Sequence, residues 1–238
     1  SLAIFSTLGL GYTSAKYVAE FKVSKPHYIP LVLKYSRNIT LIVSSILALI
    51  LFFSANYVSS SILEAPHLNL PLKVMSTWLV FNAVTTTQIG FLSGLGAFKG
   101  MARINIIVGI VTFFLSVLFT YLWGLNGALI ALLIIQILNC LLNYRLIKLE
   151  LTAIEEFKTF GDKTFLKEML RFSLPLSLQE GVYAIALWAT IMLLVKFSTY
   201  GELGLYTAAM QWNAVILFIP NILRNVVLSH FSKVNKDS

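Results

Sequence analysis

Residues 172–195 read FSLPLSLQEGVYAIALWATIMLLV. A helix that crosses a membrane needs about 20 mostly apolar residues, and this stretch is long and apolar enough to do so. It nevertheless places Gln179 and Glu180 side by side, about a third of the way along. These two residues raise two questions: which solvent surrounds the chain, and what an amide and a carboxyl group face inside it.

Composition answers the first question. Of the 238 residues, 58% are hydrophobic and 12% are charged, and the mean hydropathy is +0.82. A soluble globular domain is roughly half apolar and about a quarter charged. This chain would expose too much apolar surface in water, so we predict an all-α polytopic bundle of helices in a membrane.

Apolar runs elsewhere in the chain extend this prediction. The runs long enough to span are 39–63, 72–97, 104–123, 126–147 and 172–195, and a less apolar one covers roughly 203–228. The opening piece, LAIFSTLGLGYTSA, ends at Lys16 and would cover only roughly 21 Å of a hydrocarbon core of about 30 Å. It lacks the basic start of a signal peptide. We therefore expect the sequence to begin inside a membrane helix and to be a fragment.

Basic residues are unevenly distributed between the seven expected helices. The connection between the first and second helices holds Lys16, Lys22, Lys25, Lys34 and Arg37. The connection between the third and fourth holds Lys99 and Arg103. The connection between the fifth and sixth holds Arg145, Lys148, Lys158, Lys163, Lys167 and Arg171. The alternate connections hold only Lys73 and Lys196. Because basic residues collect on the cytoplasmic side, this alternation predicts the topology. It also accounts for the net charge of +8 without nucleic acid as a partner.

One connection is long. Residues 148–171 carry both signs of charge, and their last part is amphipathic in a helical projection. The apolar face of that part consists of Phe165, Leu166, Met169 and Leu170. We expect this segment to lie along the cytoplasmic membrane surface. It is the natural boundary between two bundles of helices, residues 1–147 and residues 172–238.

Polar side chains in lipid are costly, so each one needs a reason. If its helix enters from the cytoplasm near Phe172, Glu180 lies about 12 Å deep. It is a candidate coupling site for a cation or proton, with Gln179 beside it, or else a glutamate that holds helices together. Arg224 is a candidate partner, and its long side chain could instead reach the lipid headgroups.

Weaker candidates for a substrate path lie in two other helices. In the third helix they are Asn82 and Gln88, together with Thr85, Thr86 and Thr87; in the last helix they are Gln211, Trp212 and Asn213. Amides hydrogen-bond hydroxyl groups, and an indole stacks on a sugar ring. Hydrogen bonding between helices explains each of them equally well. Gln136, Asn139 and Asn143 indicate packing, as do Gly90, Gly94, Gly96 and Gly100.

The sequence predicts no metal site and no cofactor. The three histidines lie near segment ends, without the spacing of metal ligands. The single cysteine, Cys140, lies inside an apolar run, where we expect a small buried side chain.

Several segments resemble a known family. FLSGLGAFKGMARINIIVGIV is similar to the junction of the fourth and fifth helices in polysaccharide flippases of the Wzx (O-antigen) type. These belong to the multidrug, oligosaccharidyl-lipid and polysaccharide (MOP) exporter superfamily. TSAKYVAEF resembles the end of the family's second helix, WGLNGAL the turn between its fifth and sixth, and FSLPLSLQ and ELGLYTAAMQWNAVILFIPNIL its seventh and eighth.

The resemblance implies two six-helix lobes around a central cavity and transport by alternating access. The substrate would be a lipid-linked oligosaccharide for envelope polymers such as lipopolysaccharide, and the location a bacterial or archaeal cytoplasmic membrane. It also implies that helices are missing at both ends. The alternatives are a cation-coupled multidrug exporter of the same superfamily and, less favoured, a membrane polysaccharide polymerase or glycosyltransferase. Such an enzyme would need paired acids in a larger loop than this sequence has.

Overall fold

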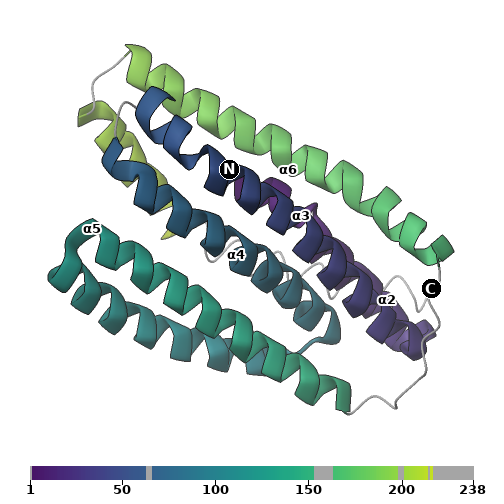
Figure 1. Cartoon of the computed structure of the whole chain (residues 1–238). Coiled ribbons are helices and arrows are strands. Elements are labelled where there is room, and N and C mark those ends of the chain that lie inside the picture. Colours follow the sequence, from purple (N-terminus) through teal and green to yellow (C-terminus); the bar gives the residue numbers. More distant parts are fainter. Residues whose placement is uncertain (1, 63–65, 153–162, 198–200, 214, 217–238) are drawn as a thin grey trace. The chain divides into compact units, whose positions relative to one another are not determined.

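The structure, a computed structural model, describes residues 2–62, 66–152, 163–197, 201–213 and 215–216. Its main helices are α1 (Leu2–Thr7), α2 (Leu10–Ser24), α3 (Ile29–Tyr57), α4 (Asn69–Leu95), α5 (Phe98–Thr152) and α6 (Lys163–Phe197), shown in Figure 1. Short 3₁₀ turns and one π-helical segment, Val58–Ile62, lie between them. No strand occurs in these described residues, which confirms the all-α prediction.

Helix α4 is the central element of the first part of the bundle. It packs against α1, α2, α3 and α5. The crossing with α2 is close because both helices present glycine there. A Cβ atom added at Gly90 would lie 2.0 Å from the carbonyl oxygen of Gly11, and one at Gly94 would lie 2.7 Å from that of Ala15. The expected packing role of these two glycines is confirmed.

Helix α5 contains two of the expected spans. Its backbone departs from helical geometry at Gly124, where φ is 57° and ψ is −136°, in the WGLNG turn that separates those spans. Figure 1 shows the two arms of α5 side by side. They are in contact, since a Cβ atom at Gly100 would meet the side chain of Leu146 at 2.7 Å. A left-handed φ favours glycine at this turn.

Helix α6 begins earlier than the apolar run alone predicts. It starts at Lys163 and continues through Pro175 to Phe197, so the amphipathic segment and the apolar run form one helix. Phe165 and Met169 are buried, at 4% and 0% exposed. The apolar face of the segment therefore packs on protein. The prediction from the sequence that this face lies on the membrane surface is wrong for Phe165 and Met169.

An aromatic cluster surrounds Phe165. Its ring lies 5.4 Å from those of Tyr17 and Phe21 on α2, 5.6 Å from Tyr28 and 6.4 Å from Tyr35 on α3. Offset and edge-to-face pairs at these distances are favourable beyond the burial of the rings. The start of α6 is thus held by rings from two earlier helices.

The chain divides into two compact units, Ser1–Ala184 and Ile185–Ser238. The boundary falls within α6. The expected division at residues 147 and 172 follows composition and stays a prediction.

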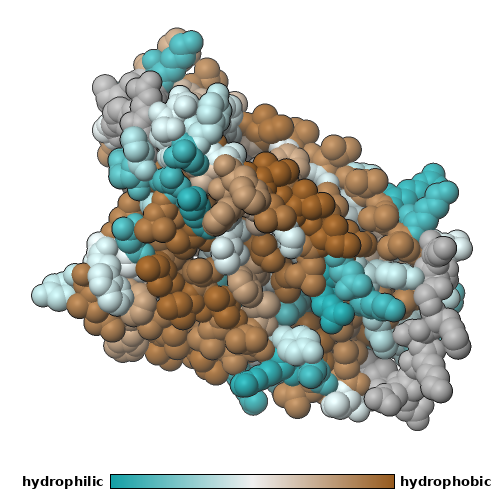
Figure 2. All heavy atoms as spheres, viewed as in Figure 1, coloured by the Kyte–Doolittle hydropathy of each residue, from teal (hydrophilic) through white to brown (hydrophobic). Residues whose placement is uncertain are grey.

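Apolar side chains dominate the outer surface. Figure 2 shows hydrophobic residues over much of the visible face, and exposed large side chains include Phe113, Phe114 and Tyr121 on α5. Three helical stretches of the described chain are long and apolar enough to cross a membrane: Pro26–Ser61, Phe98–Thr152 and Thr164–Leu194. A surface of this kind belongs in lipid.

Candidate functional site

Glu180 lies in the half of α6 that belongs to the first unit. Its side chain is half-buried, and Gln179 beside it is exposed. The next residue, Gly181, faces α1 so closely that a Cβ atom there would lie 2.7 Å from the ring of Phe5. Among the described residues, Glu180 makes no hydrogen bond and no ion pair.

Four other candidate residues belong to the last part of the chain. Gln211, Trp212 and Asn213 lie in the helical stretch 201–213 and are exposed, Trp212 by 70%. Arg224, the expected partner of Glu180, lies outside the described residues.

In the polar band of α4, Thr85 and Thr87 are buried and Thr86 is exposed. Thr85, Thr86 and Thr87 each donate a hydrogen bond to the carbonyl oxygen four residues earlier in the same helix, at 2.8, 2.9 and 3.1 Å. The hydroxyl groups of Thr87 and Thr40 are also 2.9 Å apart, which links α4 to α3. These bonds satisfy the hydroxyl groups within the bundle.

Two amides of α4 behave differently from the threonines. Asn82 is half-buried and lies one turn from Thr85 and Thr86. Gln88 is only 7% exposed, and its side-chain oxygen, Oε1, has no hydrogen-bond partner among the described residues. Buried polar atoms are nearly always paired, so this oxygen is an exception, as are Ser14 Oγ and Asn69 Oδ1 in the described part of the chain.

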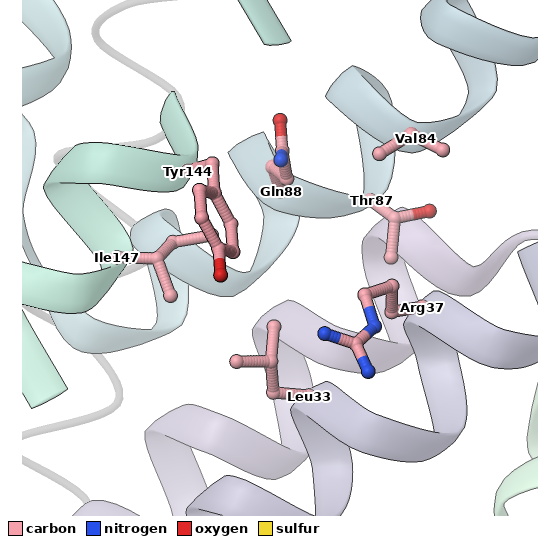
Figure 3. A pocket seen from close by; sticks show the side chains of 7 residues that line it. All are labelled: Leu33, Arg37, Val84, Thr87, Gln88, Tyr144 and Ile147. Atoms are coloured by element: carbon pink, nitrogen blue, oxygen red, sulfur yellow. The ribbon is translucent and has the colours of Figure 1, made fainter. Parts of the chain in front are cut away.

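A cavity of about 20 Å³ lies beside Gln88. It is lined by Leu33 and Arg37 from α3, by Val84, Thr87 and Gln88 from α4, and by Tyr144 and Ile147 from α5, as Figure 3 shows. The guanidinium group of Arg37 is turned toward the space between α3 and α4 (Figure 3). It makes no hydrogen bond or ion pair to any residue that the structure describes. Arg37, Thr87, Gln88 and Tyr144 thus line one mostly apolar cavity, and they come from three helices.

Sequence reasoning identified Gln88 and missed Arg37 and Tyr144. Arg37 counts as a topological charge in the sequence, because it precedes the apolar run at 39–63. Helix α3 in fact begins at Ile29, so Arg37 lies two turns inside it. A helical projection of 29–57 would place Arg37 on the face of Leu33 and Thr40, each one turn away.

Three amides of α5 were expected to serve helix packing, and each makes a hydrogen bond. They are Gln136, Asn139 and Asn143. Gln136 donates a hydrogen bond to the carbonyl oxygen of Phe81 at 3.5 Å, joining α5 to α4. Asn143 is 2% exposed and donates to the carbonyl and side-chain oxygens of Asn139 at 2.9 and 2.7 Å.

Fold and surface together define a membrane protein that is helical throughout the described ranges apart from short connections. A family model described as polysaccharide biosynthesis protein matches residues 36–238. The chain belongs to this family, which confirms the expected kinship with polysaccharide proteins. Searches of curated proteins and of solved structures returned no match.

Proposed function

We propose that this protein is a transporter that flips lipid-linked oligosaccharide units across the cytoplasmic membrane of a bacterium or archaeon. The observation that carries the proposal is the match to a polysaccharide biosynthesis family over residues 36–238 of an apolar helical bundle. A charged saccharide on a lipid anchor needs a polar path through protein, because polar groups are costly in lipid. Alternating access between two lobes would supply that path.

The proposal makes the protein a multi-pass transporter and not an enzyme. The sequence has no large loop with paired acids to hold a metal-bound nucleotide sugar. Its partners would be the lipid-linked oligosaccharide, the surrounding membrane lipids and a proton or sodium as coupling ion. No step of this transport calls for a bound cofactor.

Complementation tests the proposal. The gene is expressed in a strain that lacks its own polysaccharide flippase, and surface polymer is measured. We expect the polymer to return. Lack of polymer at normal expression of the protein would contradict the proposal.

A second candidate function is cation-coupled export of small drugs. The half-buried carboxyl group of Glu180, which has no partner in the described part of the chain, favours it, because such exporters need a site that binds a proton or sodium in exchange. Drug resistance in the same strain distinguishes the two. Resistance without surface polymer would favour the exporter.

A further inference from the structure

We propose that an open groove between α3 and α4 binds one glycerophospholipid, with the lipid phosphate on Lys73 and one acyl chain along the groove. Lys73 is one of the two lysines that the sequence places in the connections opposite the basic side. The expected topology therefore assigns this lipid to the outer leaflet. The inference does not depend on the proposed transport. It rests on the shape of the groove, on the position of Lys73 and on two hydroxyl groups in the wall.

The groove follows one face of each helix. Its volume is about 290 Å³, and its wall consists of Ser45, Ala48, Leu49 and Phe52 on α3 and of Ser76, Thr77 and Val80 on α4. The spacing of three and four residues within each set places the members on one side of their helix. From Phe52 to Ser45 the groove extends for about 10 Å along α3. This length and the largely apolar wall suit a hydrocarbon chain.

Lys73 supplies a positive charge at one end of the groove. It lies on the same face of α4 as Thr77, one turn nearer the start of the helix at Asn69. Its ammonium group is 5.5 Å from the centre of the Phe52 ring, which forms the wall at that end. Lys73 makes no ion pair with any residue that the structure describes. A lysine near a helix end reaches the level of the lipid headgroups, and its ammonium group binds phosphate as a point charge.

Two hydroxyl groups of the wall lie deeper than Lys73. Ser76 donates a hydrogen bond to the carbonyl oxygen of Lys73 at 2.7 Å, as serine and threonine commonly do within a helix. Thr77 and Ser45 make no hydrogen bond in the described part of the chain. Thr77 lies about 6 Å further along α4 than Lys73, so it would face the ester groups of a lipid whose phosphate is on Lys73. Its hydroxyl group can donate to an ester carbonyl oxygen.

This arrangement favours a glycerophospholipid over two other ligands. A sugar ring in the groove would place its hydroxyl groups against Ala48, Leu49 and Val80, and burying polar groups without partners is costly. A polyprenyl phosphate would satisfy Lys73, but it has no ester group for Thr77. A glycerophospholipid supplies the phosphate, the esters and the chain in the order in which the groove presents their partners.

Native mass spectrometry of the purified full chain tests the proposal. The delipidated protein in detergent is titrated with dioleoyl phosphatidylglycerol, and the dissociation constant of the first bound lipid is measured. We expect Lys73→Gln to weaken this binding severalfold, because the phosphate loses its cation. Thr77→Phe should also weaken it severalfold, because the ring fills the groove. Dioleoylglycerol has the same chains without the phosphate, and we expect it to bind the wild type severalfold more weakly.

Two matched controls make the same changes away from the groove. Lys196→Gln removes another lysine whose ammonium group lies over a ring, at 5.7 Å from the centre of Phe197. Thr190→Phe adds the same ring at an exposed threonine of α6. We expect both variants to bind phosphatidylglycerol like the wild type.

Several results would overturn the proposal. If the wild type binds phosphatidylglycerol and dioleoylglycerol equally, the phosphate has no site, and this comparison needs no variant to fold. Equal affinity of Lys73→Gln and the wild type would place the lipid elsewhere. Tighter binding of a polyprenyl phosphate would exclude the ester contact. A dimer that forms without bound lipid and is lost in Thr77→Phe would make the groove an interface between two copies of the chain.

Discussion

At the scale of single residues, some polar side chains of the bundle have hydrogen-bond partners, and others have none among the described residues. The threonines of α4 bond to their own helix and to Thr40. Glu180 and the Oε1 atom of Gln88 have no such partner among the described residues. Unsatisfied groups inside an apolar bundle are where we expect ligands to bind, because burial without a partner is costly.

We expect Glu180→Gln to slow transport severalfold at normal protein abundance. The amide keeps the size of the side chain and removes the charge that a coupling ion or a polar substrate path would use. Polymer export in the complemented strain measures the effect. The control is Glu150→Gln, which makes the same change at another half-buried glutamate, at the end of α5. Unchanged export in Glu180→Gln would remove this carboxyl group from the mechanism, and reduced abundance alone would assign it to folding.

A second prediction concerns glycine at the crossing of α2 and α4. In Gly90→Ala the new Cβ atom would overlap the backbone of Gly11, so the helices must move apart. Overpacking of this kind costs about 1–3 kcal/mol, and we expect a lower thermal midpoint in detergent. Gly109→Ala on α5 is the matched control, because a Cβ atom there meets nothing within 4 Å. Equal midpoints for the two variants would contradict the close crossing.

At the scale of elements, the start of α6 is fastened to α2. The Phe165 ring is surrounded by rings of α2 and α3, and the hydroxyl group of Tyr17 donates a hydrogen bond to Oε1 of Glu168 at 3.3 Å. On the other side of this contact, Lys16 places its ammonium group 3.8 Å from the centre of the Phe172 ring. The start of α6, from Lys163 onward, therefore packs within the first unit and is held there by these contacts.

This contact makes a prediction about pH. Burial, together with the nearby negative charge of Glu168, raises the pKa of Tyr17 from 10.0 to about 12. Because this pKa is raised in the folded protein, the contact contributes its full stabilisation to the folded protein below pH 10. This stabilisation is lost as the pH rises toward about 12. We expect thermal unfolding of the wild type to become more sensitive to pH in that window than unfolding of Tyr17→Phe.

The same variant has a second readout. At neutral pH, Tyr17→Phe should cost about 1 kcal/mol, the typical value of one hydrogen bond. In alkaline absorbance titrations, the wild type should show one tyrosine with a pKa of about 12 that the variant lacks. Identical titrations would show that Tyr17 is open to water.

At the scale of the whole molecule, the two arms of α5 make the topology testable. The arms meet at the turn around Gly124, so Lys99 and Lys148 lie at one end of this hairpin and Asn126 at the other. The charge distribution places the first two on the cytoplasmic side.

Labelling of introduced cysteines checks this arrangement. In a Cys140→Ser background, we expect cysteines at positions 99 and 148 to react from the cytoplasmic side and one at position 126 from the opposite side. The outcome against the proposal would be reaction of all three from one compartment. Cysteine at position 34, in an earlier basic connection, should behave like positions 99 and 148.

Much of the fold could be predicted from the sequence, and the candidate site only in part. Composition indicated helices in lipid, and the WGLNG turn was expected at the point where Gly124 breaks α5. The start of α6 was missed because charge ends an apolar run without ending a helix. Gln88 was identified as a polar residue in an apolar helix, whereas Arg37 was assigned to topology because nothing local shows what its side chain faces.

The sequence by itself determined the solvent, the class of helix and the alternation of charged connections. These properties depend on sums over neighbouring residues, so a single chain suffices to read them. Only the tertiary structure decided that Arg37 and Gln88 line one cavity and that the rings of Phe165 and Tyr17 are in contact. Such neighbours depend on the rotation and register of helices that are far apart in the chain. Packing between side chains sets that rotation and register.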